Sequence, residues 1–282
     1  MNNRPKAEIA QAFLTELWQT LLSVLKILLQ SRRVKVLKSE QVPDEIVILG
    51  NGPSLRPFIE NKRTFFNGKA LLAVNYAVLS DYYTDLKPHY YVVADPAFFF
   101  NPDHCHKLFD ALVAKTTWKL ELYLSRHALK SRLWQSKLAA YPHIQVHYFN
   151  MTPVEGFTWF THFAFTKGWG TPRPRNVLIP SIMIALRMPF RTLYVAGADH
   201  SWLKEIWVDE ENVVMEDLNH FYDKKGSKRF VSDKRLHDLL LSMHIAFRSY
   251  HFIEAYARSI GKKIYNVTEG SFIDAFDRKK IE

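Results

Sequence analysis

The residues that could carry chemistry begin in the stretch EIVILGNGPSL, residues 45–55, where a short apolar run ends in a turn. Gly50 and Gly52 tolerate backbone angles that other residues avoid, and Ser54 is suited to cap a following helix. Backbone N–H groups of such a turn can approach an anion, which the helix N-terminus also favours. The turn therefore predicts a nucleotide-phosphate site formed by Gly50, Asn51, Gly52 and Ser54. A tight turn with a purely structural purpose is the alternative.

The turn matches neither of two well-known phosphate-binding motifs, because it lacks the third glycine of the dinucleotide fingerprint and the Gly-Lys-Ser/Thr of a P-loop. Other apolar runs also end in polar residues, namely Asn75, Asp95 and Asp199. Ligands of parallel sheets bind at the carboxyl ends of the strands, so we expect these residues to converge on one site. Asp95 and Asp199 are also candidate metal ligands, although the sequence contains no Asp-x-Asp triplet.

The elements that must position these residues alternate along the chain. Short apolar runs occur at residues 46–49, 70–75, 90–95, 120–125, 144–149, 192–199 and 262–268, with helix-length segments between them. Runs that are apolar on both faces are typical of a parallel sheet covered on both sides. The sequence therefore predicts an α/β fold, a Rossmann-like and mostly parallel sheet with helices on both faces. We expect this domain over residues 41–282, after a helix and linker over residues 1–40.

The N-terminal helix is predicted over residues 7–31. Its apolar stripe has helical spacing and consists of Leu14, Leu17, Trp18, Leu21, Val24, Leu25 and Leu28. Glu16, Gln19 and Lys26 interrupt the apolar stretch, which argues against a signal peptide and against a membrane-spanning helix. We therefore expect the stripe to pack on the domain or on a second subunit, as in a homo-oligomer, or to lie on a membrane surface.

Basic residues follow this helix, namely Arg32, Arg33, Lys35 and Lys38. On a membrane they would meet anionic lipid headgroups, and residues 7–38 would then form a peripheral contact with the inner face of the cytoplasmic membrane.

Composition narrows the classes further. The 282-residue chain has 48% hydrophobic residues, which excludes a disordered protein, and a formal net charge of +10, which favours anionic ligands. No nucleic-acid-binding motif is visible, so we expect no nucleic-acid partner. Cys105 is the only cysteine, which excludes an intrachain disulfide and a multi-cysteine metal site. We expect Cys105 to be a buried apolar residue and the protein to be cytoplasmic.

A segment over about residues 150–176 is rich in aromatic residues, glycine and proline, without a steady period. We expect it to form a lid-like insertion, with Trp159, Phe160 and Trp169 either stacking on a ligand ring or packing within the loop. Residues 203–235 form a second long, charged excursion.

The stretch ILGNGPSL resembles the opening strand and loop of the bacterial sialyltransferases of glycosyltransferase family 42, in which this loop binds the nucleotide of CMP-sialic acid. A related opening also occurs in the MptE-like proteins, a group that includes a 6-hydroxymethylpterin pyrophosphokinase. LLAVNYAV resembles the second strand of family 42, which implies that Asn75 contacts the donor. VVADPAFFF resembles the next motif, but Asp95 stands where the family has a donor-binding asparagine.

The resemblance continues to about residue 275. SIMIALRMPFRTLYVAGAD is similar to a helix and strand of the family, and RPRNVLIP before it makes Arg175 and Asn176 candidate donor-binding residues. The family's first phosphate-binding tyrosine falls near Ser201, which cannot serve in the same way, and Tyr222 is the candidate for the second. The family's last helix and strand are similar to HFIEAYARSIGKKIYN, which implies that His244 is the catalytic histidine. His200 is the second candidate.

The resemblance implies a GT-A-like glycosyltransferase that moves sialic acid or a related sugar from a CMP-activated donor to a surface-glycan or glycolipid acceptor. A histidine would act as general base, since its pKa is near neutrality. Arg175, Arg173, Tyr222 and the glycine turn would stabilise the leaving phosphate without a metal or another cofactor. The alternatives are an MptE-like, Mg²⁺-dependent pyrophosphoryl transferase, which Asp95 favours, and a non-catalytic nucleotide-binding protein of a polysaccharide locus.

Overall fold

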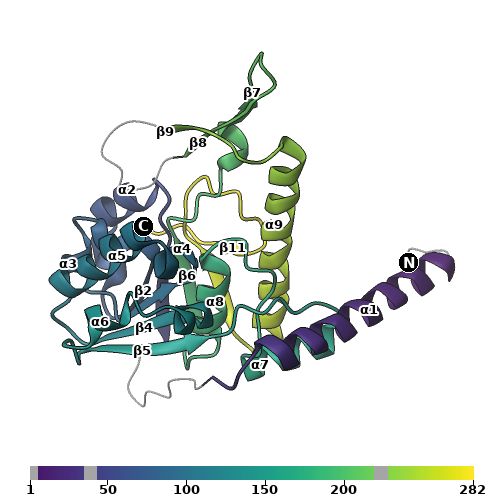
Figure 1. Ribbon diagram of the computed structural model, residues 1–282, viewed down its shortest axis with the longest axis horizontal. Coiled ribbons are helices and arrows are strands. Elements are labelled where there is room, and N and C mark those ends of the chain that lie inside the picture. Colours follow the sequence, from purple (N-terminus) through teal and green to yellow (C-terminus); the bar gives the residue numbers. More distant parts are fainter. Residues whose placement is uncertain (1–5, 35–42, 219–227) are drawn as a thin grey trace.

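The structure is a computed structural model that describes residues 6–34, 43–218 and 228–282. Its centre is an eight-stranded sheet, and every pair of neighbouring strands in it is parallel (Figure 1). The strands are β1 (Glu45–Leu49), β2 (Ala70–Val74), β3 (Tyr90–Val93), β4 (Leu120–Ser125), β5 (Ile144–Phe149), β6 (Thr192–Ala196), β10 (Lys263–Asn266) and β11 (Asp277–Arg278). The predicted α/β fold is confirmed, and each predicted strand is present.

The strand order is β11-β10-β6-β1-β2-β3-β4-β5. The chain builds the sheet outward from β1 to β5 and then returns to the other side of β1 with β6. The neighbouring strands β1 and β6 therefore mark the point at which the order reverses, where open parallel sheets bind their ligands.

Two hydrophobic cores cover the two faces of the sheet. Ile46 and Ile48 point into one core and Val47 and Leu49 into the other, because successive side chains of a strand alternate between faces. The first core includes the helices α7 (Thr158–Lys167), α8 (Leu178–Leu186) and α9 (Leu236–Ser259). The second includes α2 (Leu55–Asn61), α3 (Tyr83–Leu86), α4 (Ala97–Phe100), α5 (Pro102–Lys115) and α6 (Gln135–Leu138). This double burial explains why the strands are apolar throughout.

Short 3₁₀ helices connect several of these elements, namely η1 (Arg63–Phe66), η2 (Asn75–Leu79), η3 (Arg126–Lys130) and η4 (Trp202–Glu205). Cys105 lies on α5 and is fully buried in the second core, as predicted. Burial raises the pKa of its thiol, which makes it a poor nucleophile.

The excursion after β6 contains a second, antiparallel sheet of β7 (Ile206–Val208), β8 (Val214–Leu218) and β9 (Lys228–Val231). It lies beside the N-terminal end of α9 (Figure 1). Tyr222 falls outside the described residues, as does most of the predicted linker before residue 41.

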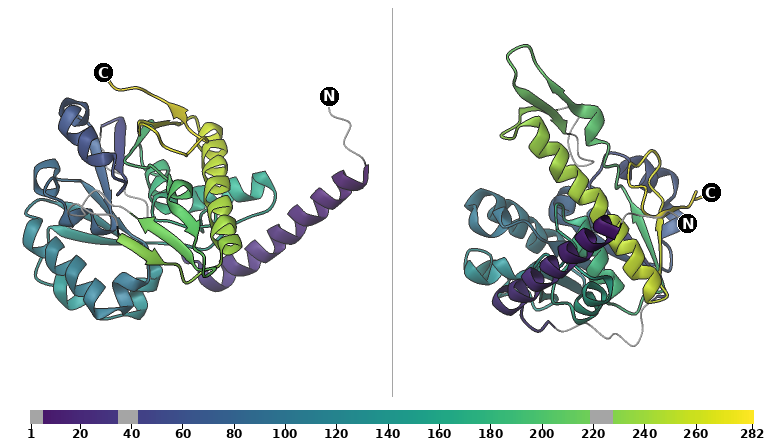
Figure 2. Two further views of the ribbon diagram at one scale, coloured as in Figure 1. Left: turned by 90° about the horizontal axis from the view of Figure 1, so that it is seen from above. Right: turned by 90° about the vertical axis from the view of Figure 1, so that its right-hand side faces the viewer.

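The helix α1 (Lys6–Gln30) is present as predicted, and its N-terminal half projects from the domain (Figures 1 and 2). All seven residues of its apolar stripe are exposed, from 37% for Leu17 to 71% for Leu28. The expectation that this stripe packs on the domain is therefore wrong. Among the described residues, α1 is the helix whose length and mean hydropathy of 1.4 would suffice to cross a membrane.

Residues 150–176 contain the helix α7, and a bridge between Pro153 and Thr171 joins the loops on either side of it. Phe160 is buried and Trp169 packs against the first core, whereas Trp159 is 70% exposed. Phe160 and Trp169 therefore pack within the fold, and the residues of this segment that line the cleft described next are Met151, Pro174, Arg175 and Asn176.

Candidate functional site

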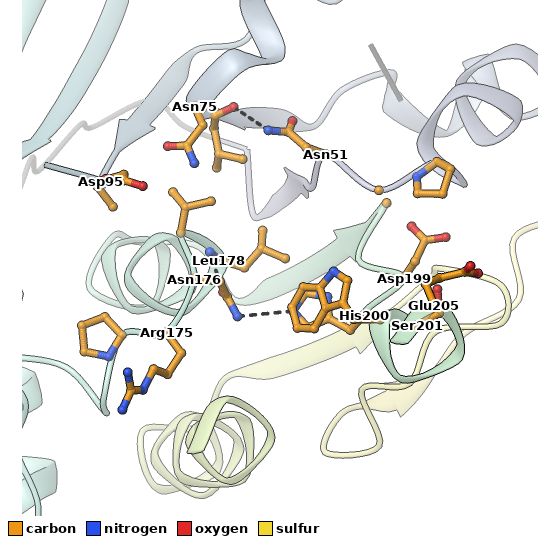
Figure 3. A pocket seen from close by; sticks show the side chains of 18 of the residues that line it. Asn51, Asn75, Asp95, Arg175, Asn176, Leu178, Asp199, His200, Ser201 and Glu205 are labelled. Carbon is orange, nitrogen blue, oxygen red and sulfur yellow. Dashed lines mark hydrogen bonds between the residues drawn. The ribbon is translucent and has the colours of Figure 1, made fainter. Parts of the chain in front are cut away.

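A cleft of about 490 Å³ opens at the carboxyl edge of the sheet, above the ends of β1 and β6. Residues from the ends of β1, β2, β3 and β6 line it, together with the segment before α8 (Figure 3). Of the residues expected from the sequence, the lining contains Asn51, Gly52, Asn75, Asp95, Arg175, Asn176 and Asp199. The expected convergence of the strand ends is confirmed.

The glycine turn contacts the chain after β6 rather than presenting its amides to a ligand. The Gly50 N–H donates to Ala196 O at 2.7 Å, and the Gly52 N–H donates to Gly197 O at 2.9 Å. A Cβ atom on Gly50 would lie 2.3 Å from Gly197 O, and one on Gly52 would lie 1.9 Å from Asp199 Oδ2. Glycine is therefore required here for close backbone approach, and these two N–H groups are already satisfied.

Ser54 does not cap α2 with its side chain, contrary to the prediction. Its hydroxyl donates to Asp199 Oδ2 at 2.8 Å, and its N–H donates to Asp199 Oδ1 at 3.3 Å. Burial raises the pKa of the Asp199 carboxyl, and the bonds from Ser54 partly offset this rise. Asp199 thus fastens the turn after β1 to the end of β6 while it also lines the cleft.

Two asparagines that line the cleft have side-chain oxygens that are buried and unpaired. The Asn51 side-chain Nδ2 donates to Val74 O at 3.2 Å (Figure 3). Its Oδ1 is buried and has no hydrogen-bond partner among the described residues. Asn75 Oδ1 is likewise buried and unpaired, and Asn75 has a left-handed backbone with φ of +47°. Buried polar atoms are normally hydrogen-bonded. Both oxygens can only accept, so they fit a ligand that carries N–H or O–H donors.

A buried hydrogen-bonded group lies opposite the two asparagines. His200 Nε2 lies 2.6 Å from the Tyr250 hydroxyl, which donates to Asn176 Oδ1 at 3.1 Å. Asn176 Nδ2 also lies 3.4 Å from His200 Nε2, so the three side chains form one hydrogen-bonded group. Asn176 Oδ1 also accepts from the N–H groups of Leu178 and Ile179 at the start of α8. Burial lowers the pKa of His200 to about 3, so the ring is neutral at physiological pH.

The charged side chains near the cleft differ in whether they are free to contact a ligand. Arg175 and Asp95 are exposed, and one Asp95 oxygen accepts from the Ala97 N–H at 2.8 Å. Arg173 is engaged elsewhere, because its guanidinium pairs with Glu155 at 2.7 Å. Within residues 6–34, 43–218 and 228–282, no group of three or more histidine, cysteine, aspartate or glutamate side chains is arranged to hold a metal ion.

His244 does not line this cleft. It is exposed on α9 and lines a shallow hollow of about 480 Å³ together with Leu203, His251 and Asp274. Phe247, from the same hollow, lies with its ring centroid 6.3 Å from that of His200. The hollow and the cleft are therefore neighbours, separated by His200 and the start of η4.

Three residues of the site were not identified from the sequence, namely Trp202, Glu205 and Tyr250. Trp202 and Glu205 of η4 line the cleft, and the Trp202 ring lies 4.3 Å from the His200 ring, so Trp202 is an aromatic surface of the kind sought in Trp159, Phe160 and Trp169. Its position just after a strand end was the available signal. Tyr250 had no such signal, because it fits the apolar periodicity of α9.

Comparisons with known proteins bear on the fold. No family model matches the sequence, and no curated protein does. Among solved structures, the chain is similar to the MAf glycosyltransferase from Magnetospirillum magneticum AMB-1, with 13% sequence identity and a TM-score of 0.51. The match covers 95% of this chain and 38% of that protein. At this identity the similarity shows that the two share a fold.

The buried His200 predicts a specific pH dependence of stability. Its pKa of about 3 in the folded protein lies below its ordinary value of 6.5, so the stability it contributes is fully present above pH 6.5 and is lost as the pH falls toward 3. Between pH 7.5 and 5.0 the free energy of unfolding should fall by about 2 kcal/mol from this group alone. Denaturant unfolding of the wild type and of His200→Asn at both pH values measures it, since asparagine tolerates the φ of +52° at this position. An equal pH dependence in both proteins would contradict the assignment.

Proposed function

We propose that the protein is a glycosyltransferase that transfers sialic acid or a related sugar from a CMP-activated donor to a surface-glycan acceptor. The observation that carries this proposal is that two residues lining a cleft at the switch point of the sheet, Asn51 and Asn75, each have a buried Oδ1 acceptor without a partner. The fold shared with a glycosyltransferase and the family resemblance of the sequence support it.

In the proposed complex the nucleoside contacts the asparagines. A cytosine amine and ribose hydroxyls supply N–H and O–H donors, which match the two acceptor oxygens. Arg175 is exposed at the cleft and forms no ion pair with a described carboxylate, so its guanidinium is available to a phosphate. Trp202 offers a ring surface beside His200. Tyr222, the remaining proposed phosphate ligand, lies outside the described residues.

In the transfer step an acceptor hydroxyl oxygen bonds to the anomeric carbon of the sugar. The bond from that carbon to the phosphate oxygen breaks, CMP leaves with the electron pair, and a base takes the hydroxyl proton. His200 is a poor base, because burial lowers its pKa to about 3 and its Nε2 is already hydrogen-bonded to the Tyr250 hydroxyl. We assign this role to His244, whose hollow adjoins the cleft through Phe247 and would receive the acceptor.

A second candidate function has one observation in its favour. Three carboxylates, from Asp95, Asp199 and Glu205, line the cleft beside a single arginine. Carboxylate oxygens are preferred ligands of Mg²⁺, as an MptE-like pyrophosphoryl transferase would require. Asp199 is occupied by Ser54, however, and the described residues contain no arranged group of three metal ligands. A non-catalytic nucleotide-binding protein would share the cleft and lack turnover.

Ligand binding tests the donor site directly. We expect CMP to raise the melting temperature without Mg²⁺, and to do so more than UDP, GDP or ATP. Asn75→Gly should weaken CMP binding at least tenfold, because it removes the Oδ1 acceptor. It should not lower the melting temperature of the free protein, since glycine readily adopts the φ of +47° found there. Calorimetric titration gives the affinities.

Arg175→Gln serves as the matched variant for the phosphate. It should weaken the binding of CMP and leave the binding of cytidine unchanged, because only CMP carries the anion. Stabilisation by ATP with Mg²⁺ alone would instead favour the pyrophosphoryl transferase.

Turnover tests the assignment of the base. His244→Asn should reduce sugar transfer about 100-fold or more, the usual contribution of a general base, while CMP affinity stays unchanged. His251→Asn is the control, because His251 lines the same hollow and pairs with Asp274 at 3.2 Å. The measurement is release of CMP from a CMP-sugar in the presence of an acceptor. Equal losses in both variants would remove His244 from the mechanism.

A further inference from the structure

The helix α1 has two chemically different faces, and the polar one contacts the domain. The buried residues are Thr20 and Ser23, in the C-terminal half of the helix, and Ser31, directly after it. Ser23 Oγ donates to Glu155 O at 2.8 Å and accepts from the Glu155 N–H at 2.9 Å. Thr20 Oγ1 accepts from the Phe157 N–H at 3.0 Å. These bonds fix the helix, while its apolar stripe remains exposed.

Close packing reinforces this attachment. A Cβ atom on Gly156, between the two hydrogen-bonded residues, would lie 2.1 Å from Thr20 Oγ1. Asn150 Nδ2 donates to Arg32 O at 2.7 Å and so holds the chain just after the helix. The orientation of α1 is therefore specified by contacts at several points along its second half.

The exposed apolar surface extends from α1 onto α7. The Phe13 and Phe157 rings lie 5.4 Å apart, and Phe157 stacks on Trp159 at 6.5 Å. Trp159 is 70% exposed and Phe163, one turn later, is 48% exposed. Together with the seven residues of the stripe, these aromatics form one continuous apolar surface, which we call the α1–α7 surface. Surfaces of this extent on a soluble domain mark a contact with another apolar phase.

Positive charge borders this surface. A hollow of about 330 Å³ lies between the end of α1 and α7. Its lining is formed by Val24, Ile27, Leu28, Ser31, Arg32, Arg33, Phe160 and Trp169. Arg32 and Arg33 are exposed, and neither forms an ion pair with a described carboxylate. An apolar hollow with two arginines at its rim fits the acyl chain and anionic headgroup of a phospholipid.

The geometry argues against a spanning helix. Residues 20–31 are held against the domain. Only residues 6–19 of α1 could therefore enter a bilayer while the domain stays outside. At 1.5 Å per residue this part is about 21 Å long, whereas the hydrocarbon core is about 30 Å thick. Apolar residues on one side and cations beside them are typical of helices that lie in the membrane interface.

We propose that the α1–α7 surface binds the face of an anionic phospholipid membrane, with α1 lying in the interface and Arg32 and Arg33 contacting lipid phosphates. This inference does not depend on the proposed reaction. It assigns the exposed stripe to lipid rather than to a second copy of the chain, because the cations bordering the hollow complement anionic headgroups.

Sedimentation of the full-length protein with vesicles tests the proposal. The wild type should bind vesicles of equal parts phosphatidylcholine and phosphatidylglycerol at least tenfold more strongly than phosphatidylcholine alone. Leu21→Ser with Leu25→Ser should lower the partition coefficient at least tenfold, because both side chains are more than half exposed on the stripe. Arg32→Gln with Arg33→Gln should abolish most of the preference for phosphatidylglycerol.

Leu240→Ser with Leu241→Ser is the matched control, because these exposed leucines lie in the first turns of α9, and Figure 1 shows the N-terminal end of α9 away from α1. It should bind vesicles like the wild type, and unchanged circular dichroism confirms that each variant is folded. No binding by the wild type, or an equal loss in the control, would overturn the proposal. The proposal would also be overturned if the wild type is a dimer in solution and Leu21→Ser with Leu25→Ser dissociates it, because the surface would then bind a second copy of the chain. If bound protein resists alkaline extraction, the proposal would be overturned in favour of a spanning helix.

Discussion

The close approach of the glycine turn to the end of β6 is the constraint on which the rest of the site depends. Two backbone hydrogen bonds and the contact between Ser54 and Asp199 join segments that are 145 residues apart in the sequence. They do so where the strand order reverses, so they fix both walls of the cleft at once. A side chain at either glycine would force the walls apart, because its Cβ atom would overlap Gly197 or Asp199.

Once this contact is made, the polar groups of the cleft fall into two sets. Asn176, Tyr250 and His200 satisfy one another, and their hydrogen bonds keep that wall rigid and neutral. Asn51 and Asn75 do the opposite, because each leaves a buried oxygen unpaired and Asn75 also holds a left-handed backbone. Unpaired acceptors and uncommon backbone angles both cost stability, and such costs are concentrated at functional sites. We therefore propose that the ligand binds on the β1–β2 side of the cleft.

The parallel sheet could be predicted from the sequence because its strands are apolar on both faces. This property can be read from each strand alone, without knowing which strands are its neighbours. The convergence of Asn51, Asn75, Asp95 and Asp199 followed from the same rule, since parallel strands end at one edge. The purpose of Gly50 and Gly52 could not be predicted in this way. Their amides point to β6, and only the three-dimensional neighbour distinguishes that arrangement from a phosphate-binding turn.

The contact between α1 and the domain and the position of His244 also could not be predicted from the sequence, because both depend on how distant segments pack. The apolar stripe of α1 predicted an interface, but the small hydroxyls of Thr20 and Ser23, which make the actual contact with the domain, carry no periodic signal. His244 was assigned from a resemblance, and its position in the neighbouring hollow depends on how α9 packs.

We propose that the cleft binds the nucleotide of a sugar donor through the two unpaired asparagine oxygens, and a crystal structure of the protein with CMP tests this proposal. We expect nucleotide N–H or O–H groups within hydrogen-bond distance of Asn51 Oδ1 and Asn75 Oδ1, with the phosphate toward Arg175. CMP bound outside the cleft, or within it with both oxygens still unpaired, would contradict the proposal.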